Sequence, residues 1–293
     1  MKTVWSFTLR NLKRYYRDMG SLFFSLLSVL IVVALYIFFL TDMQVRSIQS
    51  VIGGRDAIEP FIHAWIVGGL LCIPAVSVPL VLLTFKVDDT AEGIYEDLIV
   101  TPVRRVYLML GYILAAWIAG FAMTCLTLIL GEIFIVVKGG SWLPILSVLQ
   151  MLGIAGLTIL AFSGFSFFAV HGLRTHSSLM VVNTMLNTLI GFFAGLYIPI
   201  GFLSDGVAAA IKAFPLSHAA ALLRRIIMKP AMNRLFSQIP IDAAGKIRQN
   251  YGMELILGGH SFTSLEMLCV LAGFGLVFYI ASAAMLAKTK VRE

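Results

Sequence analysis

Residues 61–85 read FIHAWIVGGLLCIPAVSVPLVLLTF, and none of them is aspartate, glutamate, lysine or arginine. An α-helix rises about 1.5 Å per residue, so about 20 apolar residues cross the hydrocarbon core of a bilayer, which is about 30 Å thick. This run is long enough to cross a membrane, and it predicts a transmembrane helix.

The composition of the whole chain supports this interpretation. Of 293 residues, 59% are hydrophobic and only 13% are charged, whereas a soluble globular domain is about 45–50% apolar and about 25% charged. A water-soluble enzyme would expose long apolar runs to water, so this class is excluded, as are disordered and collagen-like chains. The sequence predicts an all-α integral membrane protein with six transmembrane helices at Ser21–Leu40, Phe61–Phe85, Val106–Val137, Ile145–Val170, Leu179–Phe202 and Ser264–Ala287.

Lysine and arginine set the expected orientation. They concentrate in the N-terminal segment, in the loop at residues 86–105, in the short loop that contains Arg174, and in the C-terminal tail. Such a bias marks the cytoplasmic side. We therefore expect a multi-pass protein of the cell membrane with both termini in the cytoplasm. The net charge of +7 suits anionic lipid better than nucleic acid, because no basic cluster is interleaved with aromatic residues.

Two segments differ from the six spans. In residues 1–20, Trp5, Leu9, Leu12 and Tyr16 recur every three to four positions, which predicts a cytoplasmic amphipathic helix lying on the membrane surface. This helix could serve as a lipid anchor or contact a partner protein. Residues 21–293 form the transmembrane domain, whose outer segment 203–262 holds apolar pieces too short to cross, at Val207–Phe214 and Ala219–Met228. We expect re-entrant or interfacial helices there.

Motifs for independent chemistry are missing from the sequence. The phosphate-binding pattern GxxxxGK[ST] and the zinc pattern HExxH are absent, and the five histidines are scattered. We therefore expect no enzymatic activity, no catalytic residue and no metal site. The carboxylates Glu132 and Glu266 lie near the outer edges of their spans, so the chain also lacks the acidic relay of a proton-driven carrier.

One face of the fifth span is polar and then small. Asn183, Asn187, Gly191 and Gly195 follow one another at intervals of four residues, which keeps them on one side of a helix. Small residues allow close helix packing, and buried amides form hydrogen bonds between helices. The stripe therefore fits packing within one chain, and it equally fits a subunit interface or the lining of a translocation route.

The loop at residues 86–105 is long and patterned. It is acidic early, at Asp88-Asp89, and basic late, at Arg104-Arg105, with Ile94 and Leu98 among the apolar residues between. Acidic residues near the start of a helix and basic ones near its end complement the helix dipole, so the pattern predicts a short helix that docks into a partner's groove. The alternative is a solvated loop.

At this loop the chain resembles the membrane subunit of an ATP-binding-cassette (ABC) exporter of the type-2 permease family. The matching motifs, in the order typical of that family, are Glu92-Gly93, Glu96-Asp97-Leu98, Thr101-Pro102, Arg104-Arg105, Gly195-x-x-x-Pro199, Pro215-Leu216 and Leu223-Arg224. The six-span layout and the amphipathic N-terminus also agree, so the resemblance extends over essentially the whole chain.

The resemblance implies a coupling loop at residues 86–105 that docks on a separate ABC ATPase subunit. The residues implied in this contact are Glu92, Gly93, Glu96, Leu98, Thr101, Pro102 and Arg104, with a second contact in the His171–Ser177 loop. ATP and Mg²⁺ would bind to the partner and no cofactor to this chain.

The resemblance also implies a second permease subunit, identical or a sibling, and a route lined by spans two and five. Pro74 and Pro79 would kink span two. The residues implied in the translocation or dimer face are Asn183, Asn187, Gly191, Gly195 and Pro199. The expected cargo is amphipathic: a drug, a hydrophobic peptide or a lipid-linked molecule. The alternatives are a secondary carrier driven by an ion gradient, and a membrane assembly factor or membrane enzyme.

Overall fold

A computed structural model describes residues 2–36, 41–52, 58–100, 103–173, 175–237 and 239–288. The structure is 84% helical, and the sheet in the described residues is a two-stranded hairpin. In chain order the elements are α1 (Lys2–Arg17), α2 (Met19–Leu35), α3 (Thr41–Ile52), α4 (Ile58–Leu70), α5 (Cys72–Ala91), α6 (Ile94–Val100), α7 (Arg105–Val137), α8 (Ile145–His171), α9 (His176–Phe193), the 3-10 helix η2 (Ile200–Phe202), α10 (Asp205–Ala213), α11 (Pro215–Ile227), α12 (Lys229–Phe236), α13 (Ile241–Asn250), β1 (Ile256–Leu257), β2 (His260–Ser261) and α14 (Ser264–Lys288).

Four apolar helices in the described residues are long enough to cross a membrane. They are the continuous α4–α5 unit Ile58–Ala91, α7, α8, and α14 up to Met285. These helices confirm the all-α membrane class and match the predicted spans two, three, four and six. The first and fifth predicted spans correspond to the helices α2 and α9. Residues 37–40 of the first span lie outside the described residues, and the total of six spans stays a prediction.

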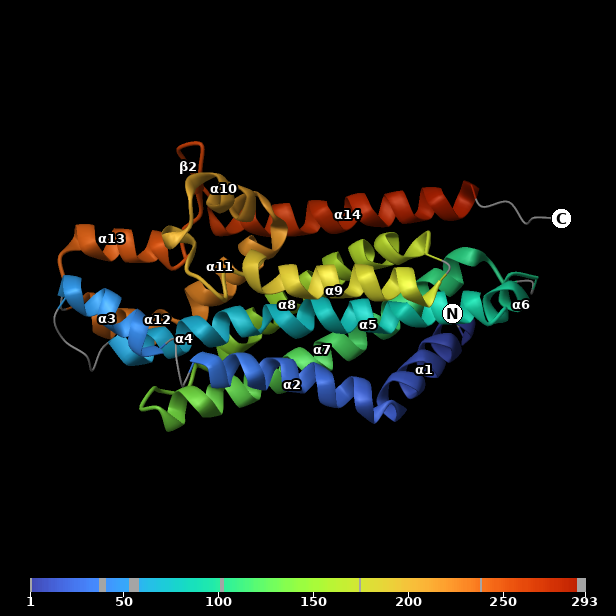
Figure 1. The fold of residues 1–293 in the computed structure, drawn as a ribbon, viewed down its shortest axis with the longest axis horizontal. Helices are drawn as coiled ribbons and strands as arrows, with labels where there is room; N and C mark the ends of the chain where they lie inside the picture. The colour runs from blue at the N-terminus through green and yellow to red at the C-terminus, as the bar shows by residue number, and fades with distance from the viewer. Residues whose placement is uncertain are drawn as a thin grey trace.

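The long helices run side by side along the longest axis of the molecule (Figure 1). The short helix α6 and the C-terminal end of α14 lie at one end, which we call the α6 end. The helices α3 and α13 lie at the opposite end, which we call the α13 end. The predicted cytoplasmic features therefore gather at one end of the bundle.

The helix α5 lies in the middle of the bundle and contributes to both hydrophobic cores. One core, near the α13 end, surrounds Trp65 in α4, and the other surrounds Tyr112 in α7. Nearly every residue of the apolar window of α4–α5 is buried within this chain. The expectation that span two lines a route between two subunits does not fit this conformation, because its side chains already pack against the same chain.

A junction at Leu71 separates α4 from α5. It lies three residues before Pro74, which has no N–H and leaves the carbonyl of Leu70 without its helical donor. Pro79 stands inside α5, and its ring carbons lie 3.3 Å from the position of a Cβ on Gly120 of α7. Pro74 therefore lies just after the α4–α5 junction and Pro79 at a close contact with α7, and the expected kink of span two stays a prediction.

The fifth predicted span ends earlier than expected, at Phe193 instead of Phe202. Gly195 has a φ of +57°, a left-handed conformation that ends helices. Leu196 N–H then donates to the Gly191 carbonyl at 2.8 Å, and Pro199 precedes the 3-10 helix η2. The apolar residues beyond Phe193 are therefore a turn, although their hydropathy continues that of the helix.

The loop predicted at residues 86–105 is helical over its first part, because α5 continues to Ala91. Within this last turn, Thr90 Oγ1 donates to the Lys86 carbonyl at 2.7 Å. The helix ends where Gly93 adopts a φ of +76°, and α6 begins at Ile94. Gly93 is thus the turn residue between α5 and α6.

In the described part of the outer segment there are four short helices and a hairpin. Helices α10 and α11 meet at 84° and correspond to the two apolar pieces that the sequence indicated, with Pro215 in the first turn of α11. Their depth in the membrane stays a prediction. The hairpin was not predicted, although its turn is Gly258-Gly259, whose φ values are +59° and +82° and whose sequence is typical of tight hairpins.

Candidate functional site

The α6 end carries the described residues that the sequence predicts for contact with an ATPase. In α6, Tyr95 and Leu98 are half-buried and pack against the core around Tyr112. Burial raises the pKa of the Tyr95 hydroxyl. On the same short helix, Asp97 and Val100 are exposed. This helix therefore has one face fixed to the bundle and one face free for a partner.

The predicted coupling residues are spread along this end. Glu92 and Arg104 are exposed, and Leu98 is half-buried. Arg104 precedes the first residue of α7 with an extended backbone. Glu96 belongs to α6, but its side chain lies outside the described part of the structure, as do Thr101 and Pro102. The described members thus surround α6.

Lys86 joins the two predicted coupling contacts. Its side chain is buried, and its Nζ donates to the carbonyl oxygen of His171 at 2.9 Å. The same ammonium lies 5.4 Å from the ring centre of Tyr95, a distance at which a cation is attracted to an aromatic face. One side chain of α5 therefore contacts α6 and the last residue of α8.

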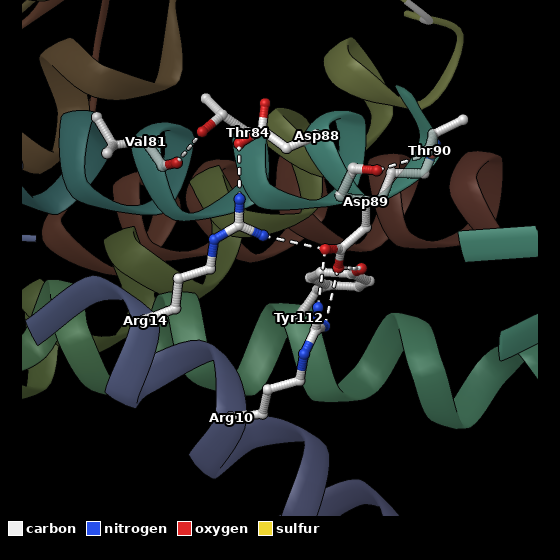
Figure 2. Close-up of polar contacts among 9 residues, drawn as sticks. Arg10, Arg14, Val81, Thr84, Asp88, Asp89, Thr90 and Tyr112 are labelled. Carbon is white, nitrogen blue, oxygen red and sulfur yellow. Dashed lines mark hydrogen bonds and ion pairs between the residues drawn. The ribbon is translucent and has the colours of Figure 1, made fainter. Parts of the chain in front are cut away.

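A carboxylate cluster fastens the N-terminal helix to the same place (Figure 2). Asp89 is fully buried, and both of its oxygens accept hydrogen bonds from Arg10, at 2.8 Å each. Arg14 donates to Asp89 at 3.0 Å and to Asp88 at 3.3 Å, and the Tyr112 hydroxyl also donates to Asp89. Hydrogen bonding to Asp89 raises the pKa of Arg10, so the guanidinium stays charged.

This cluster corrects one sequence-based interpretation. Asp88 and Asp89 lie in the last turns of α5, and not at the start of a helix, where acidic residues complement the dipole. A pair of carboxylates at a helix C-terminus is unfavourable by itself, and Arg10 and Arg14 compensate it. Helices α1, α5 and α7 are consequently connected by one ionic network.

The network was not foreseen from the sequence. The basic residues of α1 were expected to face lipid or a partner, yet two of them point into the protein. The available signal was the spacing of four between Arg10 and Arg14, which places both on one helix face, together with an adjacent acidic pair directly after a long apolar run.

The connection between α8 and α9 is joined to α5 through the hydrogen bond from Lys86 to the His171 carbonyl. Helix α9 is capped by Thr175, whose hydroxyl oxygen accepts a hydrogen bond from the Ser178 N–H at 3.3 Å. A capping threonine satisfies one of the free N–H groups at a helix start, so this connection has a defined helix entry.

The polar and small residues that the sequence places on one face of the fifth span are partly covered by contacts within this chain. Asn187 Nδ2 donates to both oxygens of Asn183, at 2.9 Å to the carbonyl and 2.6 Å to the side chain, and both residues are half-buried. Gly191 is covered by the ring of Tyr197, and Gly195 forms the turn described above. The two glycines and Pro199 thus shape the end of α9 within this chain.

A different face of α9 is exposed in the single chain. Its large apolar side chains with at least 40% exposure are Met180, Val181, Met185, Leu189 and Phe192. Val181, Met185, Leu189 and Phe192 follow the helical repeat, so these four form one continuous apolar surface.

No group of three or more potential metal ligands occurs among the described side chains. A comparison with curated proteins found no match. A family model described as "ABC-2 family transporter protein" matches residues 43–284. This match spans most of the chain and includes the α4–α5 unit, the α6 region and the outer helices. The chain therefore belongs to the ABC-2 transporter family and is a permease-type, multi-pass membrane protein.

Proposed function

We propose that this chain is the membrane subunit of an ATP-driven exporter, and that a separate ABC ATPase docks on its α6 end. The observation that carries the proposal is the Lys86 side chain, which contacts both α6 and the end of α8. An ATPase that displaces α6 would move the α8–α9 connection with it.

The Asp89 network supports the same proposal. It attaches α1 to the end of α5, directly before the turn at Gly93. Because a bidentate contact between arginine and a carboxylate is geometrically specific, α1 and the coupling segment move as one body. A rigid unit of this kind is suited to transmit the closure of an ATPase pair to the spans.

In this proposal the energy-supplying chemistry belongs to the partner. The sequence contains no GxxxxGK[ST] motif, so ATP and Mg²⁺ would bind to the ATPase and no cofactor to this chain. The α6 end would face the cytoplasm, and both termini would lie on that side of the cell membrane.

The cargo would be amphipathic and would pass beside a second permease subunit, identical or a sibling. The exposed apolar face of α9 provides a mostly apolar surface for such a cargo, and the half-buried Asn183–Asn187 pair lies on another face of the same helix. Such a surface suits a drug, a hydrophobic peptide or a lipid-linked molecule better than a polyanion.

The runner-up function is a secondary carrier driven by an ion gradient. Glu132 is the carboxylate that favours it, because it is buried within α7 and one of its oxygens, Oε1, has no partner. A single carboxylate whose other oxygen accepts the Leu143 N–H at 3.1 Å forms no relay across the membrane, so the ATP-driven function is preferred.

Charge reversal on the exposed face of α6 tests the proposal. Asp97→Arg should reduce co-purification of the ATPase and lower substrate-stimulated ATP hydrolysis. The matched control is Asp205→Arg, the same change at an exposed position in α10, which should leave both unchanged. Export that is driven by an ion gradient in liposomes, without nucleotide or ATPase, would overturn the proposal.

A further inference from the structure

An arginine lies in the interior of the α13 end, far from the predicted coupling residues. The side chain of Arg224, near the end of α11, is 1% exposed. Its Nη2 donates to the Gly195 carbonyl at 2.8 Å, and its Cζ lies 4.9 Å from the ring centre of Trp65. Among the described residues no carboxylate forms an ion pair with it, and its Nε has no partner.

Four glycines make room for this side chain. A Cβ on Gly69 would lie 2.9 Å from Nη2, and a Cβ on Gly68 would lie 2.8 Å from Cγ. Cβ atoms on Gly195 and Gly252 would lie 3.4 Å and 3.3 Å from Nη1. The Arg224 side chain therefore lies in a cradle of four glycines, and a Cβ on Gly68 or Gly69 would displace it.

The four glycines belong to three separate parts of the chain. Two lie in α4, one forms the turn that ends α9, and one follows α13. The turn after α13 is also joined directly to α4, because Trp65 Nε1 donates to the Tyr251 carbonyl at 2.9 Å. The cradle is complete only while these parts keep their present arrangement.

A buried cation without a counter-charge is costly, and it is tolerated where hydrogen bonds and aromatic faces replace water. Moving the end of α9 away from α4 would remove the acceptor at Gly195 and separate the walls of the cradle. The arginine thereby favours the arrangement in which the three parts are together.

We propose that Arg224 is a positioning residue that holds the α13 end of the translocation route closed by fastening the end of α9 to α4 and to the turn after α13. This inference rests on the proposed function, in which cargo leaves at this end. The neighbouring Arg225 does not share the role. Its guanidinium binds Met253, Phe262 and Ser264 and does not contact α4 or the end of α9.

Cys72 provides a natural reporter of closure. It is fully buried and lies three residues after Gly69. The other two cysteines, Cys125 and Cys269, are replaced by serine so that only Cys72 reacts. The full chain, purified with its ATPase if one is bound, is treated with a charged, water-soluble maleimide in the absence of nucleotide, and the rate of labelling is measured.

We expect slow labelling of the parent protein and labelling at least about tenfold faster in Arg224→Gln, because a hydrogen bond from a charged donor contributes that much to an equilibrium. The matched control Arg225→Gln should change the rate by less than about twofold. Arg225 does not contact the cradle, and sites without shared contacts affect one another only slightly. Gly69→Ala provides an independent test in a chain that keeps Arg224, and it should also expose Cys72.

Equal labelling of Arg224→Gln and Arg225→Gln would overturn the proposal, because it would indicate general loosening of the outer helices. Unchanged labelling in Gly69→Ala would overturn it as well, and this holds even if Arg224→Gln does not fold. The labelling needs no nucleotide, so a failure of ATP-driven export in every variant and in the parent would refute the proposed function without affecting this result.

Discussion

The Arg10 guanidinium donates two hydrogen bonds of 2.8 Å to the two carboxylate oxygens of Asp89, a residue 79 positions away in the sequence. Asp89 is fully buried, whereas the Arg10 side chain is 37% exposed. Exposed ion pairs stabilise proteins little because water screens them. This pair differs, because the carboxylate is removed from water and depends on its donors for hydrogen bonds.

Replacement of this carboxylate is the first prediction. Asp89→Asn should lower the free energy of unfolding by about 1.5–3 kcal/mol, the value typical of hydrogen bonds to charged groups, and toward the lower value because Arg10 is partly exposed. Helix α1 should also become more susceptible to proteolysis. Thermal unfolding in detergent and limited proteolysis measure the two effects.

Asp88→Asn is the matched control for this change. The Asp88 side chain is 22% exposed, and its contact with Arg14 is 3.3 Å long, so the loss should be clearly smaller. If both variants lose the same stability, the buried position of Asp89 has no special importance.

The second prediction concerns transmission between the two loops. Lys86→Met keeps the aliphatic part of the side chain but removes the hydrogen bond to the His171 carbonyl. We expect export per ATP hydrolysed to fall about 2–30-fold, the range for changes in coupling of about 0.5–2 kcal/mol, while the ATPase stays bound. Transport and hydrolysis are measured on the same vesicles.

Lys13→Met makes the same chemical change at an exposed position of α1 and should leave the ratio unchanged. A normal ratio in Lys86→Met would show that the two loops act independently.

The spans were predictable because their signal is local. Long uncharged runs fix the ends of α7, α8 and α14 to within a few residues, since no other structure satisfies the backbone in lipid. The amphipathic pieces of the outer segment likewise indicated α10 and α11, whose mutual angle depends on Pro215 and on packing that a single run does not encode.

The Asp89 network was not predictable because its signal is distant. Residues 88–90 are polar and look like a loop, yet they continue α5, since Arg10 and Arg14 neutralise both carboxylates from another part of the chain. The end of α9 was predicted wrongly for the opposite reason. Its hydropathy continues past Phe193, and only the conformation of Gly195 ends the helix.

The third prediction concerns the turn before α6. Gly93 has a φ of +76°, and a Cβ there would meet no atom within 4 Å. Gly93→Ala should therefore act through backbone conformation alone, at a cost of about 1–2 kcal/mol, and should change the direction of α6. We expect weaker ATPase binding and a melting temperature lower by about 2–4 °C.

Gly245→Ala is the control, because Gly245 also has open space around it but lies inside α13, in a helical conformation that alanine adopts readily. Gly93→Asn should restore part of the binding, since asparagine tolerates the left-handed region better than alanine. Equal behaviour of the alanine variants at both positions would contradict the role of Gly93 as the turn residue.

The fourth prediction decides what Gly191 does. If it packs within the chain, as the Tyr197 ring above it indicates, Gly191→Ala should displace that ring and its edge-on contact with Phe192, at 5.1 Å between centres. The expected loss is about 1–3 kcal/mol, as for other overpacked sites. Tyr197→Ala should suppress this loss, so the double variant should be no less stable than Tyr197→Ala alone.

If Gly191 instead meets a second permease subunit, Gly191→Ala would weaken the dimer in the presence and in the absence of the tyrosine. Chemical cross-linking of the single and double variants in membranes distinguishes the two outcomes, since only an interface residue loses cross-linked dimer in both backgrounds.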